Sequence, residues 1–302
     1  MFDSHFSVNN WFKVSGQPRI FANLLCAALE REQQTGQKIL ELLSSVCTYQ
    51  TFPLGDRYIY VNVAKYQSDF LLDLFSDVKD YETKTGLRVL PSLLSVFQSA
   101  PRVWFINLSE RKTSILLEVL KLQPEKKPVK LTGWSDEESE VRSFLQFLPY
   151  ISQLSFDPQS SDPSEKNRIF VNLLCAAAER EQQTGEKILE LLSSVCTYQT
   201  FPLGDDDDDD PEYQCDFLLD LFSHVKDYET KTGLRVLPSL LSVFQSAPRV
   251  WFINLSERKT SILLEVLKLQ PEKKPVKLTG WSDEESEVRS FLQCLPYISQ
   301  LR

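Results

Sequence analysis

The sequence contains few of the residue types and motifs that enzymes use in chemistry. Its 302 residues include two histidines, His5 and His224. They include no Cys-x-x-C pair, no Gly-x-Ser-x-Gly nucleophile motif and no phosphate-binding Gly-x-x-x-x-Gly-Lys-[Ser/Thr] loop. The residues therefore suggest no catalytic set. The sequence predicts a protein that is not an enzyme and that uses no cofactor.

Signals for nucleic acids and membranes are also missing. The net charge is −9, from 33 basic and 42 acidic residues, whereas binding to a phosphate backbone needs basic patches. No run of 18 apolar residues could span a membrane, and the first residues lack the basic start and apolar stretch of a secretory signal. Four of the six cysteines lie in apolar helical patterns, which is typical of buried thiols in a reducing compartment. We expect a cytoplasmic protein without nucleic-acid or membrane partners.

What the sequence does contain is an internal duplication. The segment RIFANLLCAALEREQQTG, from Arg19, recurs as RIFVNLLCAAAEREQQTG from Arg168. A longer segment further along recurs with one change, Asp77 to His224. Self-similarity of this kind is the signature of repeat architectures. We divide the chain into an irregular N-terminal segment (1–18), a first repeat block (19–154), a linker (155–167) and a second repeat block (168–302).

Each block combines helix pairs with short strand-like stretches. Both helix pairs of a block share the pattern Glu-x-x-Thr-Gly between their helices. A glycine stands where each first helix must stop: Gly36, Gly86, Gly185 and Gly233. The strand leucines Leu108, Leu131 and Leu154 are 23 residues apart, and VWFINL carries apolar groups on both faces, as a covered parallel strand does.

This regular spacing predicts the fold class. Short apolar strands, each preceded by a helix, favour an α/β fold: a stacked strand–helix solenoid with parallel strands on one side and helices on the other. The alternative is an all-α helical repeat solenoid, in which RVWFINL and KPVKL are connectors rather than strands.

The 23-residue units resemble leucine-rich repeats of the ribonuclease-inhibitor type. The stretches that carry this resemblance are INLSERKTSILLEVL, VKLTGWSDEESEVRSFLQFL and ISQLSF. The places where that family has an asparagine or cysteine, at 110–112 and 133–135, hold other residues here. As a tandem array the sequence looks like those of fish NOD-like receptor (NLR) type proteins. The resemblance implies a non-enzymatic protein–protein interaction module that serves as the ligand-sensing or scaffold part of an innate-immune receptor-like protein.

Four tryptophans are the candidate partner-contact residues: Trp104, Trp134, Trp251 and Trp281. Aromatic side chains are enriched at the energetic centres of interfaces. At the rim where the strands end they would contact a protein partner; the competing interpretation is packing against the next unit.

The chain ends offer a second way to bind protein. Solenoids need polar caps to shield their terminal units. The last strand, YISQLR, has no capping unit after it. We therefore also expect self-association through uncapped solenoid ends.

The most unusual stretch is GDDDDDDPEYQ. The first block has GDRYIYVNVAK in the same place, although the repeat sequence on either side is nearly unchanged. Because the repeat accepts two such different stretches, we predict a variable, solvated surface loop here. The run lacks the EF-hand pattern. Two alternative functions stay open: a metal (calcium)-responsive repeat protein acting through this loop, and an enzyme with a site around His224, Cys215 and the loop. The run comprises Asp205, Asp206, Asp207, Asp208, Asp209 and Asp210.

Overall fold

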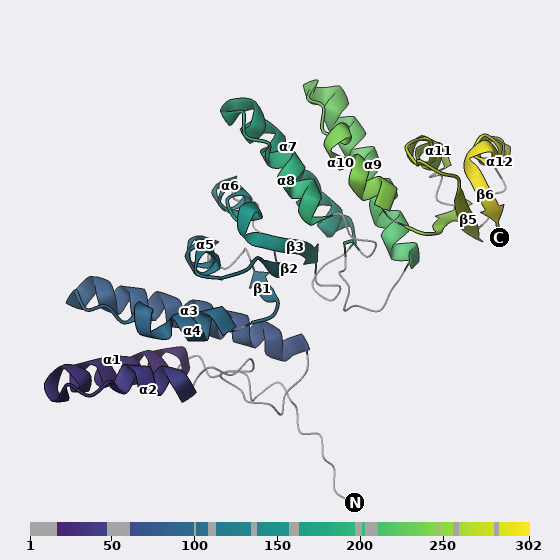
Figure 1. Ribbon diagram of the computed structural model, residues 1–302. Helices are drawn as coiled ribbons and strands as arrows, with labels where there is room; N and C mark the ends of the chain where they lie inside the picture. The colour runs from purple at the N-terminus through teal and green to yellow at the C-terminus, as the bar shows by residue number, and fades with distance from the viewer. Residues whose placement is uncertain are drawn as a thin grey trace, which may run out of the picture. The chain divides into compact units, whose positions relative to one another are not determined.

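The computed structural model is mainly helical with short strands (Figure 1). It describes residues 17–46, 61–99, 101–107, 113–133, 138–156, 163–196, 201–202, 211–246, 248–255, 260–280 and 284–302. These residues fall into two compact units. The first comprises the described residues up to Ile106 together with Ser114–Glu125, and the second comprises Asn107–Thr113 and Lys126–Arg302. The second unit therefore joins the end of the first repeat block to the whole of the second.

Both repeat blocks fold into the same succession of elements. Within the described residues, helix hairpins are followed by strands that alternate with single helices. The first block contains α1 (Gln17–Thr35), α2 (Ile39–Val46), α3 (Val61–Thr85), α4 (Leu90–Ser99), β1 (Trp104–Asn107), α5 (Thr113–Lys121), β2 (Lys127–Gly133), α6 (Glu138–Leu145), the 3₁₀ helix η3 (Leu148–Tyr150) and β3 (Ile151–Phe156). The second contains α7 (Pro163–Thr184), α8 (Ile188–Val195), α9 (Pro211–Thr232), α10 (Leu237–Ser246), β4 (Trp251–Asn254), α11 (Thr260–Lys268), β5 (Lys274–Gly280), α12 (Glu285–Leu292), η5 (Leu295–Tyr297) and β6 (Ile298–Leu301).

The strands pair in parallel. β2 lies beside β3, with Leu131 opposite Phe156. β4, β5 and β6 form one sheet in that order, with Ile253 opposite Leu278. A parallel pair needs a crossover connection, which the single helix between successive strands supplies. The predicted mixed α/β class is confirmed, and the all-α alternative is wrong because WFIN and KPVKL form strands.

The turn of each described helix hairpin is built by the Thr-Gly part of the predicted pattern. The four glycines after the first helices have φ between 68° and 75°, a left-handed conformation that other residues adopt only with strain. The threonine hydroxyl accepts a hydrogen bond from the backbone N–H two residues on, as Thr232 does from Leu234 at 3.2 Å. Each first helix therefore stops where the sequence predicts.

The glutamate of the pattern caps the second helix of the hairpin, a role that the sequence does not reveal. Glu229 Oε1 on α9 accepts hydrogen bonds from the backbone N–H groups of Val236 and Leu237, both at 2.7 Å. These donors stand at the start of α10, where no intrahelical acceptor exists and where the helix dipole favours a negative charge. The same carboxylate cap recurs in the other hairpins with Glu32, Glu82 and Glu181.

Glu229→Ala is expected to lower the free energy of unfolding by about 1–3 kcal/mol, because it leaves two backbone donors without their acceptor. Glu229→Gln keeps an acceptor oxygen and should recover part of the loss. Urea unfolding followed by circular dichroism measures the change, with the exposed turn residue substituted in Glu272→Ala as the control. An unchanged midpoint for Glu229→Ala would mean that water replaces the carboxylate without cost.

The end of the first block packs directly on the start of the second, inside the second compact unit. Helix α6 contacts α7, while η3 and β3 contact α8. The ring of Phe156 at the end of β3 lies 6.1–6.4 Å from the rings of Phe170, Phe201 and Phe217. Its backbone N–H donates to the Pro202 carbonyl at 2.8 Å. We call this contact of α6, η3 and β3 with α7 and α8 the internal junction.

Candidate interaction surfaces

Two of the four tryptophans predicted to contact a partner belong to the core. The side chains of Trp104 in β1 and Trp251 in β4 are both 0% exposed. A fully buried side chain offers no surface to a partner, so for these two the partner-contact hypothesis is corrected to core packing. Trp134 and Trp281 lie outside the described residues, and their role stays a prediction.

His224 and Cys215 are not brought together. Both lie on α9, nine residues apart, which separates them by roughly 13 Å along the helix axis. Cys215 is buried, and its sulfur accepts a hydrogen bond from the backbone N–H of Phe252 at 3.1 Å, whereas His224 is exposed. Among the described residues no cluster of His, Cys, Asp and Glu could hold a metal ion. The acidic run at 205–210 lies outside those residues, so its calcium role stays a hypothesis.

Burial raises the pKa of each remaining described thiol, including that of the half-buried Cys26. Burial raises the pKa of Cys175 and of Cys294 to about 11, and it raises the pKa of Cys196 well above the usual value. Thiols with such a pKa are protonated near neutral pH and are poor nucleophiles. None of the described cysteines forms a disulfide. In the same part of the chain, no helix is long and apolar enough to cross a membrane.

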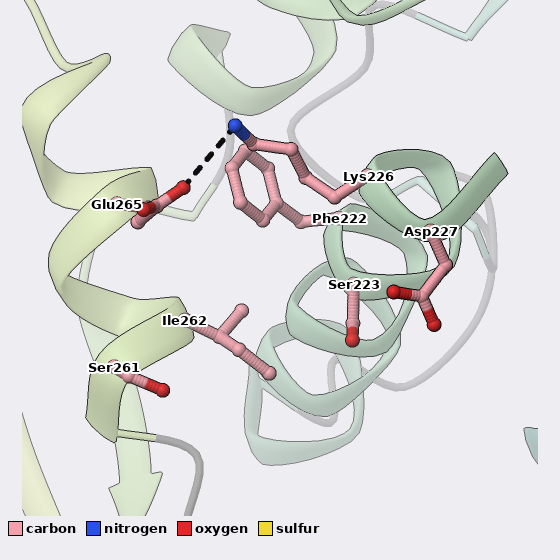
Figure 2. A pocket seen from close by; sticks show the side chains of 7 residues that line it. All are labelled: Phe222, Ser223, Lys226, Asp227, Ser261, Ile262 and Glu265. Atoms are coloured by element: carbon pink, nitrogen blue, oxygen red, sulfur yellow. Dashed lines mark ion pairs between the residues drawn. The ribbon is translucent and has the colours of Figure 1, made fainter. Parts of the chain in front are cut away.

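An open groove lies between α9 and α11 (Figure 2). Lys226 of α9 reaches across it, with its Nζ 3.4 Å from the Glu265 carboxylate on α11 and 5.8 Å from the centre of the Phe222 ring. Both charged side chains are about half exposed, at 46% and 52%. An ion pair with this exposure contributes less than about 1 kcal/mol to stability.

The groove is a poor candidate for a small-molecule site. Its volume is about 220 Å³, below the roughly 300–1,000 Å³ of typical ligand pockets. Its lysine and glutamate bind each other. The first block repeats the arrangement, with Lys79 Nζ 2.9 Å from Glu118 and 6.0 Å from the Phe75 ring centre. We interpret both pairs as the packing of one helix on the next.

Exposed apolar side chains gather at two places in the described structure. The first, which we call the N-face, lies on α1 and α2, helices that pack against each other in the first unit. The second, the C-face, lies on α12, η5 and β6 in the second unit. Every member is at least 43% exposed. The N-face consists of Ile20, Leu24, Leu42 and Val46, and the C-face of Leu292, Leu295 and Leu301.

The equivalent side chains in the other repeat block are buried at the internal junction. Counterparts of the C-face are 1% exposed: Leu145, Leu148 and Leu154. Counterparts of the N-face on α7 and α8 are at most 4% exposed: Ile169, Leu173 and Val195. Leu191, the counterpart of Leu42, is 36% exposed, against 67% for Leu42. The N-face and the C-face are thus the two halves of a contact that the protein already makes once within itself.

Composition alone does not reveal these faces, because the residues that form them are the same in both blocks. The N-face and the C-face differ from their counterparts in exposure, which depends on what packs against each copy in the folded chain.

Comparison with known proteins gives no relative from which a role could be transferred. No family model matches the chain, and neither a curated protein nor a solved structure does.

Proposed function

We propose that the protein is a non-enzymatic protein–protein interaction module. The observation that carries the proposal is the pair of exposed apolar faces, the N-face and the C-face. Contiguous exposed apolar surface is uncommon on a monomeric protein and marks sites of protein interaction. Their counterparts in the other repeat block are buried at the internal junction, so side chains of this kind and spacing suit packing on protein. The partners are therefore other proteins, including further copies of the chain.

The architecture that presents these faces is, in our proposal, a stacked strand–helix solenoid of the leucine-rich-repeat-like kind. The order β4–β5–β6 supports it, because each strand lies beside the next strand along the chain. Each added unit of such a stack covers the apolar face of the unit before it and exposes one of its own. An interaction surface at the end of the stack follows from this construction.

The sequence resemblance to the repeat arrays of NOD-like receptor type proteins supports a more specific role. We propose the ligand-sensing or scaffold part of an innate-immune receptor-like protein. Shielded thiols without disulfides among the described cysteines support a reducing, cytoplasmic setting.

Site-specific photo-crosslinking tests the interaction module. A photoreactive amino acid in place of Leu24 on the N-face or Leu295 on the C-face is expected to capture protein in cells that express the full chain. Matched controls carry the same probe at Gln33 on α1 and at Gln293, directly after α12. Both glutamines are exposed, and so are their counterparts beside the internal junction. Equal capture at all four positions would contradict a role for the two faces.

A further inference from the structure

We propose that the chain associates head to tail with copies of itself, the C-face of one molecule packing on the N-face of the next. The contact reproduces the internal junction between molecules. This inference rests on the proposed function, because it names the partner of the same two faces.

The internal junction supplies the template for the contact. There α6, η3 and β3 cover the apolar side of α7 and α8 and reduce the exposure of Leu148 and Leu173 to 1% and 0%. Their counterparts Leu295 and Leu24 are 43% and 51% exposed. Two surfaces that bury each other when present in one compact unit carry the same complementarity when they belong to different molecules.

The two sides of the template are conserved within the chain almost residue for residue. Segment 138–154 recurs as 285–301 with one change, Phe147 to Cys294. Both of these side chains are 0% exposed inside their own block, so the change leaves the face itself intact. Segment 19–47 recurs as 168–196 with three changes, at Ala22, Leu29 and Gln37. Ala22 and Leu29 are buried and are not among the N-face residues, while Gln37 is exposed in the turn after α1.

The intermolecular contact is expected to be weaker than its template. At the internal junction Phe156 adds a ring to the cluster around Phe170, whereas the C-face consists of leucines and contributes no ring. Two separate molecules also lose translational freedom that a single chain does not. We therefore expect a dissociation constant on the order of micromolar.

The geometry fixes the kind of assembly. The C-face and the N-face are different surfaces, so each molecule that binds through one face leaves the other available. Such a heterologous contact grows into an open chain unless the rotation between molecules closes a ring. An isologous dimer, in which one face meets its own copy, is not expected.

Sedimentation velocity on the full chain tests the proposal. The mean mass of the wild-type protein is expected to rise continuously with concentration. Leu24→Glu and Leu295→Glu should each weaken association at least about 100-fold, since each places a charge at the centre of the contact. Both positions are exposed, so neither change should unfold the monomer, which circular dichroism checks. The controls Gln33→Glu and Gln293→Glu add the same charge outside the contact and should associate as wild type does.

Mixing the two blocked variants separates head-to-tail contact from every other arrangement. Leu24→Glu retains its C-face and Leu295→Glu retains its N-face, so an equimolar mixture should form a dimer that stops at two molecules, while each variant alone stays monomeric. A wild-type protein that is monomeric at every concentration would overturn the proposal. So would association that only one variant abolishes, or a mixture that forms no dimer. Photo-crosslinking of a different protein at the same faces would in those cases still support the interaction module.

Discussion

Trp251→Ala is expected to lower the free energy of unfolding of the second compact unit by about 3–5 kcal/mol. The side chain is 0% exposed in β4, and β4 packs against α9 within that unit. Removing the indole leaves a cavity that the strand and helix around it can fill only in part, so the cost of the cavity adds to the lost burial. Because domains are stable by about 5–15 kcal/mol in total, urea unfolding should show a large shift of the midpoint.

Two further variants test the physical reason for this loss. Trp251→Phe removes less volume, and it also removes an indole N–H that has no hydrogen-bond acceptor within the described part of the chain. A loss of about 1–2 kcal/mol is therefore expected. Trp104→Ala in the first unit should match Trp251→Ala, because Trp104 is equally buried. An unchanged midpoint for Trp251→Ala, together with weaker binding of a protein, would restore Trp251 as a contact residue.

The elements that the sequence predicts are those set by strong local signals. VWFINL has apolar groups on both faces, as a covered parallel strand requires, and its stretch WFIN forms β1 and β4. A glycine after a threonine ends α9, because Gly233 takes a left-handed backbone conformation that residues with a side chain disfavour. The spacing of the strand leucines predicts strands separated by single helices. In each case the information lies within a few consecutive residues.

What the sequence leaves open depends on contacts between distant residues. Glu229 lies in a run of charged and polar residues that reads as a solvated helix surface, yet its carboxylate caps a helix that begins eight residues later. Trp251 is an aromatic residue of the kind enriched at interfaces, yet its side chain is fully buried in the core. Leu148 and Leu295 have nearly the same neighbours in sequence but differ in exposure, 1% against 43%. Local patterns carry no information on which copy of a repeat is covered by another.

The two leucines offer a matched test of this last point. Leu148→Ala is expected to lower the free energy of unfolding by about 2–5 kcal/mol, because it opens a cavity between η3 and α8 at the internal junction. Leu295→Ala removes the same atoms from the same local sequence. Since Leu295 is exposed on the C-face, the expected loss is within about 0.5 kcal/mol. Urea unfolding at a protein concentration below that of self-association measures both.

The dependence of this difference on concentration links stability to assembly. When molecules associate through the C-face, binding stabilises the folded wild-type chain by mass action. Leu295→Ala weakens that contact, so its deficit relative to wild type should grow as the protein concentration rises, while the deficit of Leu148→Ala already exists in the monomer. Equal losses for the two variants at high dilution would mean that Leu295 is covered within a single molecule. That result would contradict both the exposed C-face and the head-to-tail association inferred from it.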